Sequence, residues 1–267
     1  MDMKTLKVLT LATILGWSSL GLAAGGGGAP IINYYSLILK AVGITDPHTI
    51  EELKPLLGSV LTFVVTLFLG LSYRAAVRRA GRDVAPAGRF SVRGVVDLIM
   101  DFVHDLATNV IGAERSRPFL PVLFGLFLFI LISNLSGLVP GFTPATESIN
   151  TNLVLGLFVF LVFNIAGIKE HGFFGYLRTY AGPIVVMMPI IFLIEAVGML
   201  ARPVSLSLRL YGNIFGDHLV LAVFTGLTKL VLPSFLLFFG LLVACLQSFV
   251  FTLLSGIYIS MAISHDH

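Results

Sequence analysis

Long uncharged apolar runs alternate along this chain with short polar segments. Three runs have the length of one membrane crossing and two longer tracts follow them: residues 56–73, 119–139, 152–168, 183 to about 228, and 232 to about 264. A helix that crosses the hydrocarbon core of a bilayer needs about 17–25 mainly apolar residues. The pattern therefore predicts an all-α membrane protein with about five membrane helices.

The tract from residue 183 to about 228 is too long for one upright helix. As a single straight helix it would measure roughly 65 to 70 Å, more than twice the ~30 Å hydrocarbon core. It therefore either breaks into two upright spans or lies steeply inclined. No polar turn of the kind expected between two spans accompanies its prolines, so we favour one long inclined helix. Such a helix would form a hairpin with 232–264 and lean on a protein partner. Candidate bends are Tyr180, Gly182, Pro183, Pro189 and Pro203.

The segment after the first span is strongly basic and then amphipathic. Its arginines are Arg74, Arg78, Arg79, Arg82, Arg89 and Arg93. This excess of positive charge places the segment in the cytoplasm. Apolar residues then recur at helical spacing (Val95, Val96, Leu98, Ile99, Phe102, Val103 and Leu106), while Asp97, Asp101 and Asp105 occupy another face. This arrangement predicts an amphipathic helix on the cytoplasmic surface.

Charge in the loops orients the remaining spans. The loop PGFTPATESINT has one Glu and no basic residue, so we place it outside, and Lys169 and Arg178 then return the chain to the cytoplasm. Residues 1–24 are typical of a signal peptide, with an uncleaved interfacial or membrane helix as the alternative. Residues 25–117 then hold an external segment, the first span and the Arg-rich segment, and 118–267 form the core. The N-terminus is expected outside and the C-terminus in the cytoplasm.

Composition narrows the classes of function. The chain of 267 residues is 57% hydrophobic and 12% charged, with a formal net charge of +3. This slight basic excess bears on membrane orientation and gives no support to nucleic-acid binding. The single cysteine, Cys245, provides no disulfide framework and no zinc-type spacing, and we expect it to be a small packing residue. No cofactor and no metal site are predicted.

The first long tract carries charged residues at membrane depth: Glu195, Arg202, Arg209 and Asp217, with His218 beside them. An Arg at the centre of a membrane helix costs at least ~2.5 to 3.5 kcal/mol, so such residues mark a functional site by default. Residues 195, 202 and 209 fall within about 40° of one another, and Asn213 continues their stripe. Glu195 and Asp217 lie about 21 Å and about 12 Å from Arg209 along the axis, too far for an intrahelical pair. Because the other spans contain no Asp or Glu, the counter-charge of Arg209 is expected from another protein.

Several polar residues of this tract admit two interpretations. His218 lies about 13 Å beyond Arg209 on roughly the opposite side. It either relays protons near neutral pH, with Asp217 and water, or packs as a satisfied side chain. Arg202 either serves the site or snorkels toward an interface, and Asp217 either lines a route or caps a helix break.

The last tract adds an amide and a stripe of hydroxyls. Gln247 needs a partner at membrane depth, either in an interhelical hydrogen bond or in a channel lining. Ser248, Thr252 and Ser255 follow at spacings of four and three, which favours close helix packing.

The segment RPVSLSLRLYGNIFGDHL, residues 202–219, resembles the signature of subunit a of F-type ATP synthases, the stator subunit beside a rotating c-ring. The resemblance includes NLSGLVPGF at 134–142, INTNL at 149–153, Glu195 ahead of the Arg202-Pro203 pair, and LQSFVFTLLSGIYISMA at 246–262. It extends from about Pro118 to the end of the chain, whereas the Arg-rich region fits only loosely.

The resemblance implies a proton-translocating stator subunit in which Arg209 is essential and faces a c-ring carboxylate. It implies two offset aqueous half-channels, with Asn213, His218 and Gln247 on the outer route. Glu195 and Ser205 then lie toward the cytoplasmic route. The subunit makes no bond to nucleotide. The implied partners are the c-ring, b-type peripheral stalk subunits and the lipid of a bacterial plasma membrane, the inner one if the cell is Gram-negative.

Two positions depart from the family pattern. Gly240 stands where some members have an ionisable residue in the last helix, and Ser148 stands, next to Glu147, where several have an Asp. The identity of the outer relay therefore stays open.

Other functions are less well supported by the sequence. An independent secondary transporter is the main alternative, but no internal repeat with matching broken helices is present. A membrane protease would need a motif such as HExxH or GxSxG, and the sequence contains neither. A voltage sensor would need a cation at every third residue, whereas Arg202 and Arg209 are seven residues apart. A structural scaffold would be favoured if Arg209 tolerated neutral substitution. The histidine relay favours H⁺ over Na⁺ as the coupling ion.

Overall fold

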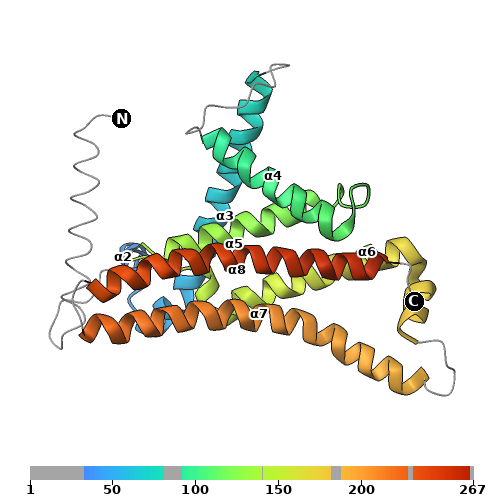
Figure 1. The fold of residues 1–267 in the computed structure, drawn as a ribbon. Coiled ribbons are helices and arrows are strands. Elements are labelled where there is room, and N and C mark those ends of the chain that lie inside the picture. Colours follow the sequence, from blue (N-terminus) through green and yellow to red (C-terminus); the bar gives the residue numbers. More distant parts are fainter. Residues whose placement is uncertain (1–32, 81–91, 140, 182–187, 228–230, 265–267) are drawn as a thin grey trace.

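The computed structural model describes residues 33–80, 92–139, 141–181, 188–227 and 231–264 (Figure 1). Within these ranges every regular element is a helix. Five of the helices are long and apolar enough to cross a membrane, which confirms the predicted all-α membrane architecture. The predicted signal peptide, residues 1–24, and part of the Arg-rich segment lie outside the described residues.

The first membrane helix is longer than its apolar run. Helix α3 spans Pro47–Ala80 and follows the short helix α2, Tyr34–Ala41.

Asn33 caps α2, because its Oδ1 accepts a 3.0 Å hydrogen bond from the Tyr35 backbone N. Burial raises the pKa of the Tyr35 phenol, which stays neutral at physiological pH.

Helix α4, Val92–Ile111, is the predicted amphipathic helix. Its buried residues Val103, Ala107 and Ile111 belong to the core that α4 shares with α5 and α8. Asp101 and Asp105 are exposed, as their side of the helix predicts. The apolar stripe is wider than the contact it makes, however, since Val95, Leu98 and Phe102 remain exposed.

Helices α5, Leu120–Gly137, and α6, Ile149–Ala181, are joined by a loop that contains the short 3₁₀ helix η1, Ala145–Glu147. Helical structure in α6 extends well past the predicted end of its span, but Gly172, whose φ of 70° and ψ of 161° are not helical, interrupts it and bends the chain. Beyond the bend the Tyr176 hydroxyl donates a 3.1 Å hydrogen bond to Asn164 Oδ1.

Helix α7, Met188–Leu227, is the longest of the described helices, with 40 residues, and α8, Val231–Ile263, follows it. Figure 1 shows them side by side, extending across the direction of α3. Helix α7 continues through Pro203. This confirms the prediction of one long helix in place of two separate upright spans. It also continues through Asp217, so the helix-cap interpretation of that residue is wrong.

The core lies among α4, α5, α6, α7 and α8, all of which contribute buried apolar side chains. Helices α6 and α7 make the most extensive contact, and Gly156 permits it: a Cβ there would lie 2.3 Å from Ser207 Oγ and 2.6 Å from the Pro203 carbonyl oxygen. Cys245, expected to pack, is instead exposed on α8.

The hydroxyl stripe of α8 serves packing, as predicted. The side chains of Ser248, Thr252 and Ser255 are fully buried, and each donates a hydrogen bond to the carbonyl oxygen four residues earlier in α8. Their hydrogen-bonding capacity is thereby used within the helix, and the small side chains allow neighbouring helices to approach closely.

Candidate functional site

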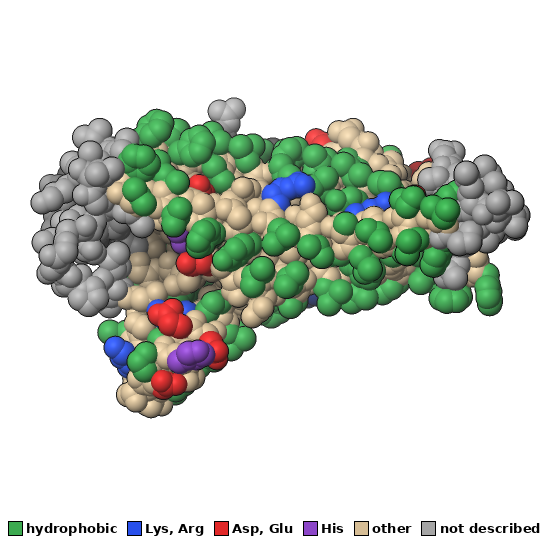
Figure 2. Space-filling model, turned by 90° about the horizontal axis from the view of Figure 1, so that it is seen from below, with side chains coloured by type: hydrophobic (Ala, Val, Ile, Leu, Met, Phe, Trp, Pro, Cys, Tyr) green, Lys and Arg blue, Asp and Glu red, His purple; other side chains and the backbone are tan. Residues whose placement is uncertain are grey.

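Arg209 lies exposed on the side of α7 that faces away from the core. Ser207 and Leu210 are buried, and they lie about 160° and about 100° around the helix from Arg209, so Arg209 is turned away from the buried face. Within the described part of the chain Arg209 forms no ion pair. Figure 2 views the molecule from the α7 side and shows basic side chains set in a mainly hydrophobic face. The arrangement presents a cation to whatever covers this face.

Arg202, one of the two arginines of this helix, already has a partner. Its guanidinium carbon lies 5.6 Å from the centroid of the Tyr258 ring of α8. A cation over an aromatic face is stabilised by the ring quadrupole. Arg202 therefore contributes to the packing of α7 on α8, which distinguishes it from Arg209.

An amide pair joins α7 to α8 one turn beyond Arg209. Asn213 Nδ2 donates a hydrogen bond of 2.5 Å to Gln247 Oε1. Asn213 is exposed, whereas Gln247 is 4% exposed and its Nε2 has no hydrogen-bond partner in the described structure. The interhelical hydrogen bond was one of two predicted roles for Gln247, and the free Nε2 leaves a donor for water or a second ligand.

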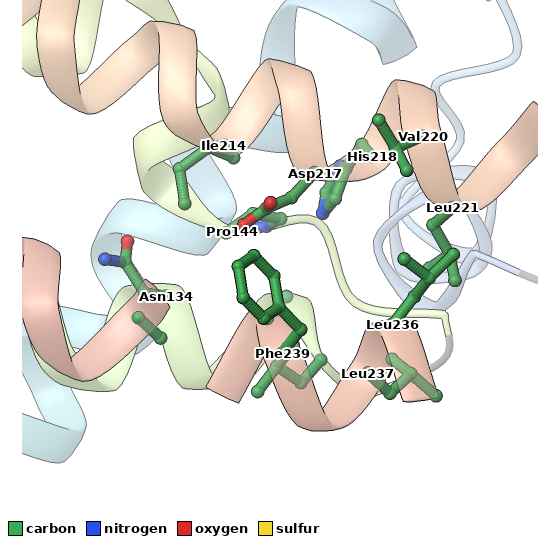
Figure 3. Close-up of a pocket in the computed structure, with 14 residues that line it drawn as sticks. Asn134, Pro144, Ile214, Asp217, His218, Val220, Leu221, Leu236, Leu237 and Phe239 are labelled. Carbon is green, nitrogen blue, oxygen red and sulfur yellow. The ribbon is translucent and has the colours of Figure 1, made fainter. Parts of the chain in front are cut away.

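A cavity of about 180 Å³ opens between α5, α7 and α8, beside the loop before η1. Figure 3 shows Asp217 and His218 pointing into it from α7, toward Pro144 and Phe239. The amide of Asn134 also lines the cavity, and its Nδ2 has no partner in the described structure. Most other lining residues are apolar, so Asn134, Asp217 and His218 supply the polar side chains of the cavity.

His218 has a carboxylate beside it that lies far away in the sequence. Its Nδ1 is 3.5 Å from Glu147 Oε1, and both side chains are partly exposed. The family pattern directs attention to Ser148, but the neighbouring residue carries the acid. Gly240, also a departure, lines the cavity on α8, where a Cβ would lie 3.1 Å from Leu138 Cδ2.

Buried hydrogen bonds hold the loop that carries Glu147. Thr146 is fully buried and donates through Oγ1 to Asn134 Oδ1 at 2.7 Å. Its backbone N donates to Ser133 Oγ at 3.1 Å, and its carbonyl oxygen accepts from Asn152 Nδ2 at 2.8 Å. Spacing patterns missed this network because they relate residues of one helix, whereas these contacts join α5, η1 and α6.

The predicted site residues divide into two groups along α7. Asn213, Asp217, His218 and, from α8, Gln247 lie on one side of Arg209 in the helix. Glu195 and Ser205 precede Arg209, are partly or fully exposed, and do not line the cavity. Among the described residues no cluster of three or more His, Cys, Asp or Glu could hold a metal ion.

Comparison with known proteins gives the family. Residues 57–260 match the family model described as ATP synthase A chain. The ATP synthase subunit a of Bdellovibrio bacteriovorus is 42% identical over 204 residues, which cover 76% of this chain and 89% of the relative. That of Citrifermentans bemidjiense is 39% identical over 236 residues, or 88% of this chain and 97% of the relative. The chain therefore belongs to the family of subunit a of F-type ATP synthases, multi-pass proteins of the membrane sector.

Proposed function

We propose that this subunit conducts protons to and from the carboxylates of a c-ring through two half-channels, with Arg209 between them. The observation that carries the proposal is the exposed Arg209 side chain, which has no carboxylate partner in the described part of the chain. A guanidinium at membrane depth is costly unless it is paired or hydrated. A ring that presents carboxylates to the α7 face supplies this pairing.

The outer route begins at Glu147 and His218. Histidine side chains commonly exchange protons near neutral pH, and the Glu147 carboxylate lies 3.5 Å from His218 Nδ1. From there Asp217 and the cavity lead along α7 to the Asn213–Gln247 pair. At about 1.5 Å per residue the route covers about 13 Å of the helix axis between His218 and Arg209.

The cytoplasmic route uses the other part of α7. Ser205 lies about 6 Å before Arg209 along the axis and Glu195 about 21 Å before it. Both side chains are accessible on the helix, so a proton released near Arg209 could be accepted by Glu195. The two routes are thereby offset along one helix, and a ring carboxylate must travel between them.

Arg209 separates the routes by its permanent charge. A guanidinium stays protonated at any physiological pH, so it cannot itself pass a proton from one route to the other. Its charge favours the ionised form of a nearby ring carboxylate and so promotes release of the proton. Protonation on the outer side neutralises that carboxylate and lowers the cost of its rotation into lipid. Torque then passes to the catalytic head, while this subunit makes no bond to nucleotide.

The proposal includes the assembly and its orientation. The partners are the c-ring along α7 and α8, b-type peripheral stalk subunits, and lipid. The subunit lies in the bacterial plasma membrane, the inner one in a Gram-negative cell, with its N-terminus outside and its C-terminus in the cytoplasm. The exposed apolar side chains of α4, Val95, Leu98 and Phe102, suit contact with the membrane surface.

The deciding experiment compares Arg209→Ala with Arg202→Ala in membrane vesicles, after the assembly of each complex has been confirmed. Both changes remove an arginine from α7, but Arg202 packs on Tyr258. We expect Arg209→Ala to abolish both ATP-driven proton pumping and ATP synthesis, since Arg209 is the only cation of α7 between Ser205 and Asn213. We expect Arg202→Ala to retain most of both activities.

Retention of coupled transport by Arg209→Ala would overturn the proposed role. Equal loss of pumping and synthesis in both variants would show that removing any positive charge from α7 has this effect. Arg209 would then have no special role as a gate.

A further inference from the structure

The loop that carries Glu147 is in close contact with α3, a helix that contributes no side chain to the cavity. We define the α5–α6 loop as residues 141–148. At Gly58 of α3, a Cβ would lie 2.9 Å from the Thr143 carbonyl oxygen and 3.4 Å from the Ala145 backbone N. Both contacts are with loop backbone, which has no flexible side chain to move aside. The absence of a side chain at Gly58 therefore sets how closely the loop approaches α3.

The same loop is confined by other contacts. Asn33 Nδ2 donates a 2.8 Å hydrogen bond to Thr143 Oγ1, and the Tyr34 backbone N donates to the Gly141 carbonyl oxygen at 3.0 Å. Pro144 lies against Gly137 of α5, where a Cβ would be 2.8 Å from Pro144 Cγ. Since Ala145 and Thr146 are fully buried, the loop has little space into which it could yield.

Displacement of this backbone would act on the His218 contact. Glu147 is the last residue of η1, two positions after the alanine that approaches Gly58. Its carboxylate lies 3.5 Å from His218 Nδ1, so a shift of a few tenths of an ångström already changes this contact. The other titratable group beside His218 is Asp217 of α7, whereas α5 and α8 present Asn134, glycine and apolar residues to the cavity.

We infer that Gly58 is a positioning residue: together with the Asn33–Thr143 bond it holds the α5–α6 loop so that Glu147 meets His218. The inference rests on the proposed outer route. It assigns to α3 a part in proton uptake although α3 has no polar group in that route. The effect passes through the loop backbone, since Gly58 touches no transported proton.

The test measures ATP synthesis in vesicles at fixed total driving force while the pH on the outer side is varied. The variants are Gly58→Ala, Glu147→Gln and the double variant, with Gly70→Ala as the matched control. Gly70 lies on the same helix, and a Cβ there meets nothing within 4 Å. Each complex is first checked for assembly.

We expect Glu147→Gln to move the midpoint of the outer-pH profile downward by about half a unit or more, because it removes a negative charge from the site of proton uptake. Gly58→Ala should move the midpoint in the same direction, and the double variant should move it no further than Glu147→Gln alone. Gly70→Ala should keep the parental profile.

A parental profile for Gly58→Ala, or shifts that add in the double variant, would overturn the inference. So would an unchanged profile for Glu147→Gln. If Gly58→Ala does not assemble, Thr143→Val decides, since it removes the Asn33 hydrogen bond with little change of shape: a downward shift supports the inference and a parental profile overturns it. Coupled transport that survives Arg209→Ala would instead overturn the proposed function itself, so the two failures are distinguishable.

Discussion

At the scale of single residues, the site is defined by which polar groups have partners within the chain and which do not. Arg202 lies over Tyr258, and Asn213 binds Gln247, whereas Arg209 makes no ion pair in the described structure. The sequence alone shows that Arg202, Arg209 and Asn213 are polar residues of one apolar tract. Their contacts are what distinguish their roles. The unpaired cation is the one that calls for a partner protein.

The amide pair between α7 and α8 gives a prediction at this scale. Asn213→Leu and Gln247→Leu should each lower the rate of coupled proton pumping about fivefold, which corresponds to about 1 kcal/mol for one lost hydrogen bond. The double variant should lose about as much as either single one, because the two side chains bind each other. Pumping rates of the four proteins in vesicles measure this coupling.

Ser248→Ala is the control for this pair. Ser248 is the neighbour of Gln247, equally buried, but its hydroxyl binds a carbonyl oxygen of its own helix, so its loss should leave pumping near the parental rate. Losses that multiply in the double variant would show that Asn213 and Gln247 act independently.

Sequence reasoning found most of these residues but not how they meet. The spacing of Glu195, Arg202 and Arg209 predicts one face of a helix because a helix repeats every 3.6 residues. No such rule relates Glu147 to His218, which lie on different elements and meet only after α5, α6 and α7 have packed. The signal in the sequence was Glu147, the acid next to Ser148. Only the tertiary structure shows that His218 lies beside it.

At the scale of elements, the apolar runs predicted the membrane helices well and their ends poorly. Helix α3 begins at Pro47 and α6 continues to Ala181, both well outside their apolar runs. A helix does not need apolar side chains beyond the hydrocarbon core, so hydropathy cannot mark where its hydrogen bonds stop. The bend at Gly172 is likewise a property of backbone conformation that composition does not reveal.

The close approach of α6 and α7 gives a prediction about stability. Gly156→Ala should destabilise the subunit by about 1–3 kcal/mol, because its Cβ would collide with Ser207 Oγ and the Pro203 carbonyl oxygen. Thermal unfolding of the purified complex, followed by loss of this subunit from it, measures the effect. Gly125→Ala on α5 is the control, since a Cβ there meets nothing within 4 Å. Equal stability of the two variants would contradict the prediction.

At the scale of the whole molecule, one long helix brings the separate parts of the site together. The apolar window of α7, Ile190–Leu221, contains 32 residues and measures about 48 Å, against a hydrocarbon core of ~30 Å. It fits within the membrane only if it is inclined, in keeping with its course across α3 in Figure 1. The length of the tract predicted this, since no polar turn interrupts it.

The alternation of loops gives a topological prediction. After Cys245→Ala, a cysteine introduced by Glu114→Cys should react with a membrane-impermeant maleimide only in inverted vesicles, and one introduced by Asn150→Cys only in right-side-out vesicles. Both positions are exposed, Glu114 before α5 and Asn150 at the start of α6. Reaction of both from the same side would contradict the proposed orientation.

The cavity between α7 and α8, which lies on the proposed outer route, also bears on the choice of ion. Its volume of about 180 Å³ equals the share of liquid taken by about six water molecules, at about 30 Å³ each. Asn134, Asp217 and His218 offer such waters hydrogen bonds, while the remaining walls are mainly apolar. A proton can cross a short file of waters by exchanging bonds along it, without moving an atom heavier than hydrogen through the gap. A sodium ion would have to carry its coordinating waters with it, so on the proposed outer route we expect proton transfer to be the easier passage.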